Sequence, residues 1–436
     1  MQMNEPALSL QWPAWRKIIF RFFFVYLFFQ VAPWSWLRII PGVDYILGFY
    51  DKLINWMVET ANAKVFHVRQ ALVPLNGSGD TSYGWAQTWL FISLAGIGCI
   101  LWSLLDRKRA GYNLANYWLC LFTRYYIAMI AFSYGILKLF AMQMYFPNLS
   151  QLATPLGDFL PMRLSWMFIG YSSPYQVFSG VMEVIAGVLL LYRRTTTFGV
   201  LFATTVFLNV MMLNLCYDIP VKIYSMHIVV CCLFLAANEW KRILNFFILN
   251  RPAAVSTAYS FPLTKKWMRI ARIVLKIYFI GLAVAAPFYN YWQYYKSAHP
   301  LAVKQPIPMG LYDVHVYVFN KDTVELSLSD TMRWRDLIFD KDGLGSIKTA
   351  DTAFRQRYKR GYFYYKTDSV QHSIRFSKLQ GDSNYIFSFR YEIPDSNTLR
   401  LWGRRINDSL FIELKKNNHH FQLAEKQFHW LSESNR

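Results

Sequence analysis

The fold class is decided by a stretch of 26 residues, 117–142, which reads YWLCLFTRYYIAMIAFSYGILKLFAM. Its length and apolar character suit a helix that crosses the hydrocarbon core of a bilayer, which takes about 20 residues. It contains only two charged residues, Arg124 and Lys138. Further stretches have the same character, and they cover about residues 18–37, 86–105, 174–192, 198–216, 221–237 and 270–292. The sequence therefore predicts a multi-pass α-helical membrane protein with seven spans.

The composition agrees with this class. The chain of 436 residues is 54% hydrophobic and 18% aromatic, and only 17% of its residues are charged, against about 25% in an ordinary soluble domain. These values exclude a disordered chain, a coiled coil and a single soluble globule. A pI of 9.6 is also typical of nucleic-acid-binding proteins. Here the basic residues stand in short runs between apolar stretches, which indicates membrane topology and no nucleic-acid partner.

The basic runs predict the orientation. They follow or precede every second span, at 16–21, 106–109, 193–194, 241–242 and 265–272. Loops rich in Lys and Arg stay in the cytoplasm, so the sequence predicts a cytoplasmic N-terminus, seven crossings and a C-terminal domain on the outer side of the membrane. The first span is expected to be an uncleaved anchor. Two shorter stretches, 43–60 and 159–171, are expected to be interfacial or re-entrant.

The last 137 residues have a different pattern. From residue 300 the apolar residues alternate with a period of two, and turn residues separate the runs, which predicts an antiparallel all-β barrel or sandwich. Strands are expected at 312–319, 324–328, 372–376, 385–393, 399–402, 410–414 and 421–423, with one more within 333–339. All five cysteines lie before residue 233. The β domain therefore has no disulfide or cysteine-based metal site.

Two charged residues deep in the predicted spans form the first candidate site. A charged side chain inside a bilayer is costly, so it is functional by default or paired with a partner. Arg124 lies in the third predicted span and Glu183 in the fourth, both toward the middle or inner side. We expect them to form a buried ion pair, which could serve packing alone.

A second group of polar residues lies near the outer ends of the predicted spans. We expect these residues to converge on a cavity, apolar at depth and polar at its mouth, that binds an amphipathic ligand such as a quinone or a lipid. The alternative is a collar of side chains around a solid bundle. The group consists of Lys138, Asn214, Asp218, Lys222, Tyr224 and His227. The histidines show no metal-ligand spacing, and the sequence assigns no catalytic residue.

Two of these stretches resemble a known family. Arg124 followed by Tyr134-Gly135-Ile136-Leu137-Lys138 resembles the Arg…Gly-x-x-Lys signature of the first core helix of DoxX-type membrane proteins. The stretch 183–196, EVIAGVLLLYRRTT, resembles the next helix of that core. The resemblance covers about residues 115–240. It implies a four-helix core within a multi-pass protein of the inner (plasma) membrane, whose C-terminal domain is then periplasmic. It also implies coupling to quinone and a redox or envelope protein as partner.

Four regions result from these patterns. They are an N-terminal membrane region, 1–114; the DoxX-like core, 115–240; an amphipathic segment with the last span, 241–299; and the extracytoplasmic β domain, 300–436. Three functions remain open. The first is a redox-linked accessory subunit that binds a quinone or lipid-like molecule. The second is a non-catalytic envelope scaffold whose β domain binds a protein or glycan. The third is a membrane enzyme similar to vitamin K-dependent carboxylase-like proteins, with Lys138 and His227 as its candidate pair.

Overall fold

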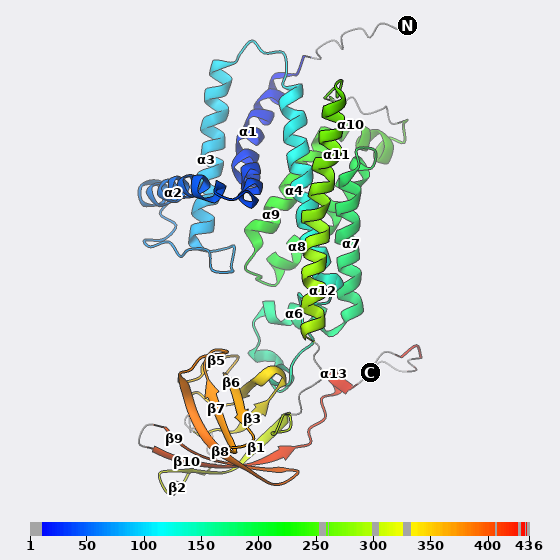
Figure 1. Cartoon of the computed structure of the whole chain (residues 1–436). Coiled ribbons are helices and arrows are strands. Elements are labelled where there is room, and N and C mark those ends of the chain that lie inside the picture. The colour runs from blue at the N-terminus through cyan, green and yellow to red at the C-terminus, as the bar shows by residue number, and fades with distance from the viewer. Residues whose placement is uncertain are drawn as a thin grey trace. The chain divides into compact units, whose positions relative to one another are not determined.

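The chain forms two compact units. One comprises Met1–Met144 and Ser172–Lys296, and the other Tyr145–Tyr171 and Ser297–Arg436. We analysed a computed structural model (Figure 1), which describes residues 11–252, 259, 261–298, 305–325, 333–405, 408–425, 429–431 and 433. The first unit is helical and the second is built mainly of β-strands. The expected fold class, a helical multi-pass membrane part with a β domain, is confirmed.

Apolar helices of membrane-spanning length make up the helical unit. Its principal helices are α1 (Ala14–Val31), α2 (Val43–Ala61), α3 (Ser82–Leu105), α4 (Asn113–Leu139), α7 (Ser173–Leu191), α8 (Thr196–Cys216), α9 (Lys222–Asn238), α10 (Trp240–Ile243), α11 (Lys266–Ile280) and α12 (Ala286–Ala298). Within the described residues, six helical segments are long and apolar enough to cross a membrane. A seventh results if the pair Lys222–Asn238 and Trp240–Ile248, bent by 76°, is one span. These segments coincide with the seven predicted stretches.

Glycines bring α4 and α7 into backbone contact. A Cβ on Gly180 would lie 2.7 Å from the carbonyl oxygen of Gly135, and a Cβ on Gly187 would lie 2.9 Å from the ring of Phe132. Only a residue without a side chain fits at such distances, as is usual where small residues let membrane helices approach closely. This contact sets the register of the two helices and hence the partners of every polar residue on them.

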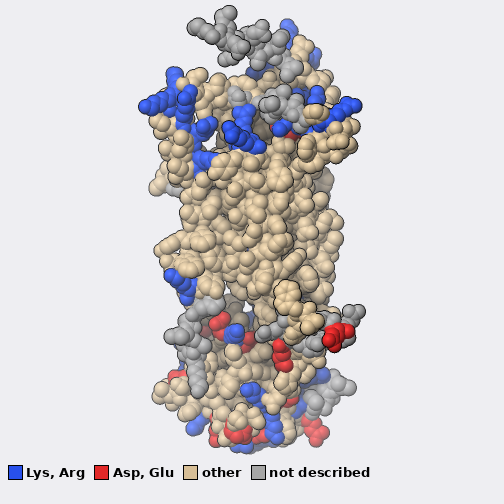
Figure 2. Space-filling view, turned by 90° about the vertical axis from the view of Figure 1, so that its right-hand side faces the viewer, with Lys and Arg blue, Asp and Glu red and all other residues tan. Residues whose placement is uncertain are grey.

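One end of the helical unit is strongly basic. The ammonium of Lys17 donates to the carbonyl oxygen of Arg109 at 2.8 Å, and both Nε and Nη2 of Arg21 donate to the hydroxyl of Tyr112. The start of α1 therefore lies beside the loop between α3 and α4. Figure 2 shows Lys and Arg gathered at this end, above a broad band of other residues on the same face. The charge pattern is that of a membrane protein.

The helix α2 differs from the spanning helices in direction. In Figure 1 it runs across the direction of α1 and α3. Gly42, with φ of +87°, begins it, and a π-helical turn, Asn62–Phe66, follows it. The second stretch that we expected to be interfacial forms α6 (Pro161–Tyr171), which belongs to the β unit together with α5 (Leu149–Leu152).

The β unit contains a closed antiparallel barrel. The strands are β1 (Gly310–Phe319), β2 (Asp322–Thr323), β3 (Asp336–Phe339), β4 (Leu344–Ile347), β5 (Arg355–Arg357), β6 (Arg360–Asp368), β7 (Ser373–Ser377), β8 (Tyr385–Asp395), β9 (Thr398–Arg405) and β10 (Asp408–Asn417). Eight of these described strands follow the order β10-β9-β8-β7-β6-β4-β3-β1, and β10 pairs with β1 to close the sheet. Closure removes the exposed edges that would otherwise invite aggregation.

Aromatic side chains fill the barrel. Trp334 is 1% exposed, and its ring lies 5.4–6.5 Å from those of Phe354, Phe376, Phe387 and Phe389. A cavity beside Trp334 has a volume of only about 20 Å³, which leaves room for little more than a water molecule. An eight-stranded barrel is just wide enough for side chains to fill. Beside Trp334, the described side chains therefore leave no room for a larger ligand inside the barrel.

The strand predictions were correct where polarity alternates. The predicted runs at 312–319, 372–376, 385–393, 399–402 and 410–414 correspond to β1, β7, β8, β9 and β10. The run at 421–423 is wrong, because Gln422–Glu425 forms a helical turn. Most of the predicted strand 324–328 lies outside the described residues. The strand expected within 333–339 corresponds to β3. The sequence analysis missed the short strands β4 and β5, and it missed β6 because the Tyr and Phe residues of β6 occupy both faces and hide the alternation.

Candidate functional site

A buried ion pair joins α4 to α7. The Nζ of Lys138 lies 2.5 Å from Oε1 of Glu183, and the two side chains are 9% and 3% exposed. The second carboxylate oxygen of Glu183, Oε2, is buried without a hydrogen-bond partner among the described residues. A Cβ on Gly180 would lie 2.8 Å from Cβ of Lys138. The close approach of the two helices therefore places Lys138 beside Glu183.

The expected pair of Arg124 with Glu183 is wrong. Arg124 donates through Nη1 to the hydroxyl of Thr196 at 3.0 Å, and its guanidinium lies 5.4 Å from the ring centroid of Tyr125. Thr196 begins α8, which follows the end of α7. The helices α4 and α7 run in opposite directions, and their register matches Phe132 with Gly187. Arg124 thus lies more than two helical turns from Lys138, beside the wrong end of α7 for Glu183.

Tyrosines and a histidine extend the polar interior from this pair. The ammonium of Lys138 lies 5.9 Å from the ring centroid of Tyr134, and Tyr134 lies 6.3 Å from Tyr224. His227, one turn beyond Tyr224 on α9, is 4% exposed and stacks on Tyr26 of α1 at 5.7 Å. Three of the residues that we predicted for the ligand site therefore lie in one cluster, in which Lys138 and His227 are buried and Tyr224 is partly buried.

His227 has one unsatisfied nitrogen in this cluster. Its Nδ1 donates to the carbonyl oxygen of Ile223 at 2.6 Å. Its Nε2 is buried and has no hydrogen-bond partner within the described part of the chain. Leaving a buried polar atom unpaired costs free energy. The packed core therefore retains unused hydrogen-bonding capacity at His227 and at Glu183.

Two of the other predicted ligand residues, Asp218 and Lys222, have structural roles. Asp80, in the loop before α3, accepts hydrogen bonds from the backbone N–H groups of Lys222 and Ile223 at 2.8 and 3.0 Å. The ammonium of Lys222 lies 2.7 Å from Asp218 and 3.5 Å from Asp80. Asp218 and Lys222 thus belong to a capping cluster at the start of α9. Asn214 is buried on α8.

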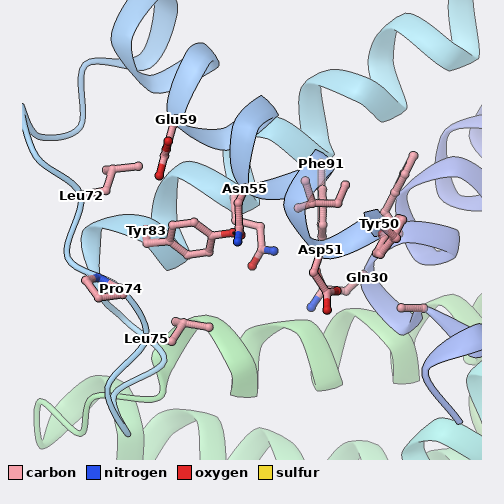
Figure 3. Close-up of a pocket in the computed structure, with 14 residues that line it drawn as sticks. Gln30, Tyr50, Asp51, Asn55, Glu59, Leu72, Pro74, Leu75, Tyr83 and Phe91 are labelled. Atoms are coloured by element: carbon pink, nitrogen blue, oxygen red, sulfur yellow. The ribbon is translucent and has the colours of Figure 1, made fainter. Parts of the chain in front are cut away.

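A ligand-sized cavity lies elsewhere in the helical unit. It is open on one side, has a volume of about 730 Å³, and is lined by α1, α2, α3 and the loop before α3. Figure 3 shows Asn55 and Tyr83 pointing toward one another and Asp51 lying beside Gln30. The lining residues are Phe29, Gln30, Ala32, Tyr50, Asp51, Ile54, Asn55, Glu59, Leu72, Pro74, Leu75, Tyr83, Gln87 and Phe91. The cavity combines aromatic walls with amides, phenols and carboxylates.

The polar groups of this cavity are only partly engaged. Tyr83 donates to the side-chain oxygen of Asn55, and Arg38 donates to both oxygens of Asp51 at 2.7 and 2.9 Å. Glu59 has no ion-pair or hydrogen-bond partner among the residues that the structure describes. Burial and the nearby Asp51 raise the pKa of Tyr50 to about 12. Its phenol therefore remains a hydrogen-bond donor at neutral pH.

The two faces of α2 differ sharply. Asp51, Asn55 and Glu59 follow one another at intervals of four and line the cavity. Large apolar residues cover the opposite face, and each is more than half exposed: Tyr45, Ile46, Phe49, Leu53 and Trp56. A helix with an exposed apolar face that lies across the spanning helices is typical of an interfacial membrane helix. This spacing was the signal in the sequence from which the cavity could have been inferred.

A known protein is similar to part of the chain. No protein-family model matches the chain, and no solved structure matches it. An uncharacterised protein of Bacillus subtilis (strain 168), YwoB, is 34% identical over 84 residues. The match covers 19% of this chain and 54% of YwoB, so the chain spans about half the length of that relative. The likeness assigns no activity.

Proposed function

We propose that this is a multi-pass protein of the plasma membrane that binds a quinone-class molecule in the cavity between α1, α2 and α3, as an accessory subunit of a redox-linked membrane system. The cavity carries the proposal. Its volume of about 730 Å³ falls within the range of roughly 300–1,000 Å³ typical of small-molecule sites. The DoxX-like motifs at Arg124…Lys138 and Glu183 support the link to quinone.

The chemistry of the walls suits a quinone head group. A quinone is a flat ring with two carbonyl acceptors, and its reduced form has two hydroxyl donors. Side-chain amides of Gln30 and Gln87 and the phenol of Tyr50 line the cavity as donors, and the carboxylate of Glu59 lines it as an acceptor. The rings of Phe29 and Phe91, stacked at 5.5 Å, supply apolar surface. Both redox forms therefore find partners.

The apolar face of α2 supports access from the membrane. The exposed residues of this face suit contact with acyl chains, while the opposite face of the same helix lines the cavity. A molecule with a polar head and an isoprenoid tail would keep its tail in lipid and place its head among Asp51, Asn55 and Glu59. The arrangement supports uptake from the bilayer rather than from water.

The basic end of the helical unit supports the orientation. Short loops rich in Lys and Arg remain in the cytoplasm, so we propose that the N-terminus and the turn at Arg193-Arg194 are cytoplasmic. The β domain, which follows the last span, is then periplasmic. Each part of this assignment depends on the same charge asymmetry.

The carboxylase-like alternative receives less support. It requires Lys138 as a base, and its amine is occupied by Glu183 at 2.5 Å. The scaffold alternative is favoured by the barrel, in which the described side chains beside Trp334 leave no room for a larger ligand. A scaffold of that kind is compatible with a ligand in the helical unit.

Binding is tested with the full chain in mild detergent. We expect lipid extracts of the purified protein to contain a prenylquinone, and a short-chain quinone analogue to quench tryptophan fluorescence saturably. Gln87→Leu removes one polar partner and should weaken binding about tenfold, the effect of roughly 1.4 kcal/mol. Lys52→Gln, on α2 but outside the lining, is the matched control. Asn55→Leu, which removes a second polar partner, should also weaken binding. If Gln87→Leu, Asn55→Leu and the control all bind the quinone analogue with equal affinity, the quinone does not bind in this cavity.

A further inference from the structure

The outer surface of the barrel has a row of cations across neighbouring strands. Lys366 of β6 is paired with Arg375 of β7, Arg375 with Ser388 of β8, and Ser388 with Arg404 of β9. All four side chains are exposed. Adjacent strands are about 4.8 Å apart, so the row extends for roughly 14 Å. Arg390, one row further on β8, adds a fourth cation.

These cations form no ion pair with any residue that the structure describes. None of Lys366, Arg375, Arg390 and Arg404, which we call the basic strip, has a carboxylate partner among the described residues. The strip places Lys366 directly opposite Arg375, and like charges in that position destabilise a sheet. Carboxylates flank the strip: Asp368 lies two residues beyond Lys366 on β6, and Glu392 lies two residues beyond Arg390 on β8. A bound anion would offset the repulsion inside the strip.

Aromatic residues border the strip. The guanidinium of Arg375 lies 5.2 Å from the ring centroid of Tyr385, which is 45% exposed. Trp402, opposite Arg390, is 38% exposed and lies 5.4 Å from Phe411. Tyr and Trp with an exposed edge are enriched at the level of lipid head groups, since one end is apolar and the other polar. Arginine binds phosphate through planar, paired donors.

The connectivity of the chain indicates which anionic surface is available. The last residue of α12 is Ala298 and the first of β1 is Gly310, so 11 residues join them and reach at most about 40 Å. The β unit also contains Tyr145–Tyr171, which lies in the chain between the end of α4 at Leu139 and the start of α7 at Ser173. Three chain connections thus hold the barrel to membrane-spanning helices. Such tethering raises the effective concentration of the bilayer at the barrel.

We propose that the basic strip binds the head groups of anionic phospholipids. Arginine and lysine bind the phosphates, while Trp402 and Tyr385 enter the interfacial layer. Attraction of this kind amounts to about a fivefold gain in affinity for each basic residue near an anionic membrane. The inference is independent of the quinone site, because no residue of the strip lies in the helical unit.

Vesicle flotation tests this proposal. The full chain in phosphatidylcholine nanodiscs is mixed with vesicles of phosphatidylcholine alone or with 30% phosphatidylglycerol. We expect the protein to float only with the anionic vesicles, and we expect the bound fraction to fall as the salt concentration rises. The double variant Arg375→Gln/Arg404→Gln should bind about 25-fold more weakly. The matched control is Arg355→Gln/Arg357→Gln, which removes two exposed charges from β5 and should bind normally.

Two results would overturn the assignment. One is equal flotation with both kinds of vesicle. The other is a double variant that binds anionic vesicles as well as the unmodified protein does. If that variant instead loses only an acidic protein that co-purifies with the unmodified chain, the strip binds a protein and the lipid assignment is wrong. Equal thermal unfolding of variant and control shows that a loss of binding is not a loss of folding. Charge reversal, Arg375→Glu/Arg404→Glu, should abolish flotation altogether.

Discussion

Lys138 and Glu183 show how a charged residue is tolerated inside a helical bundle. Each is almost completely buried, and they lie 2.5 Å apart. Removing both charges from water is costly, and their mutual attraction repays the cost only with good geometry. The glycines that bring α4 and α7 together supply that geometry. The ion pair therefore forms only because the contact between α4 and α7 holds the two side chains together.

Substitutions at this pair should be strongly asymmetric. Glu183→Gln or Lys138→Met leaves one uncompensated charge and should lower the free energy of unfolding by about 3–5 kcal/mol. The double variant Lys138→Met/Glu183→Leu removes both charges and should recover most of that loss. Thermal unfolding in detergent measures the three variants. Arg124→Gln is the matched control, and a double variant less stable than both single variants would contradict this account.

Asp340 is a buried carboxylate in the β unit. It accepts a hydrogen bond from the N–H of Lys341 at 2.8 Å and lies 3.5 Å from the N–H of Ser150 in α5. Burial raises its pKa above the usual value of 3.8, and these N–H groups oppose that effect only in part. The folded state therefore binds the Asp340 proton more tightly than the unfolded chain does.

The sign of the pH dependence follows from that shift. As the pH rises above 3.8, the unfolded chain loses this proton first, so the contribution of Asp340 to stability falls until the folded carboxyl also ionises. In Asp340→Asn this contribution is absent. Hydrogen exchange of β3 and β4 amides in the full chain, from pH 4 to pH 7, should show a smaller loss of protection in the variant. Parallel profiles would contradict the buried carboxylate.

At the scale of elements, the contact between α4 and α7 organises the helical unit. Gly135, Gly180 and Gly187 each lie where a Cβ would come within 3.0 Å of the facing helix. By contrast, a Cβ on Gly96 of α3 would have no neighbour within 4 Å. In the sequence, both kinds of glycine stand within apolar helices and look alike. Only the facing element separates them.

A pair of substitutions distinguishes these glycines. Gly180→Leu forces α7 away from α4 and should cost about 1–3 kcal/mol or more through overpacking, and it should also disrupt the pair of Lys138 with Glu183. Gly96→Leu meets open space and replaces glycine with a better helix former, so its stability should be unchanged or higher. Chemical unfolding in mixed micelles measures both. Equal losses would show that the close contact is not the cause.

At the scale of the whole molecule, charge asymmetry predicts the topology. Arg193 and Arg194 lie at the same end of the helical unit as the basic start of α1, whereas Asn76 lies in the loop at the end where Asp80 caps α9. Single cysteines at positions 76 and 194, in a variant lacking the five native cysteines, test this. We expect position 76 to react with an impermeant maleimide in intact cells and position 194 only after permeabilisation. The reverse result would invert the proposed orientation.

Properties encoded by neighbouring residues could be predicted from the sequence. Span length, the charge pattern and the two-residue period of β1, β8 and β10 depend on nothing distant, so the apolar spans and the β domain were predictable. The aromatic strand β6 escaped because both of its faces are large and partly apolar. The polar residues of α4, α7 and α9 were evident in the sequence, because they interrupt apolar stretches. Their partners were not evident, because those lie on other helices.

Partners and cavities were decided by tertiary structure. Helical spacing placed Arg124 and Lys138 on one face of α4, and either could have met Glu183. The choice of Lys138 depends on the register of α4 against α7, which glycine contacts set across a gap of about 50 residues in sequence. The cavity depends likewise on how α2 crosses α1 and α3. Local sequence determines which face a residue occupies, but only packing between distant elements determines what that face meets.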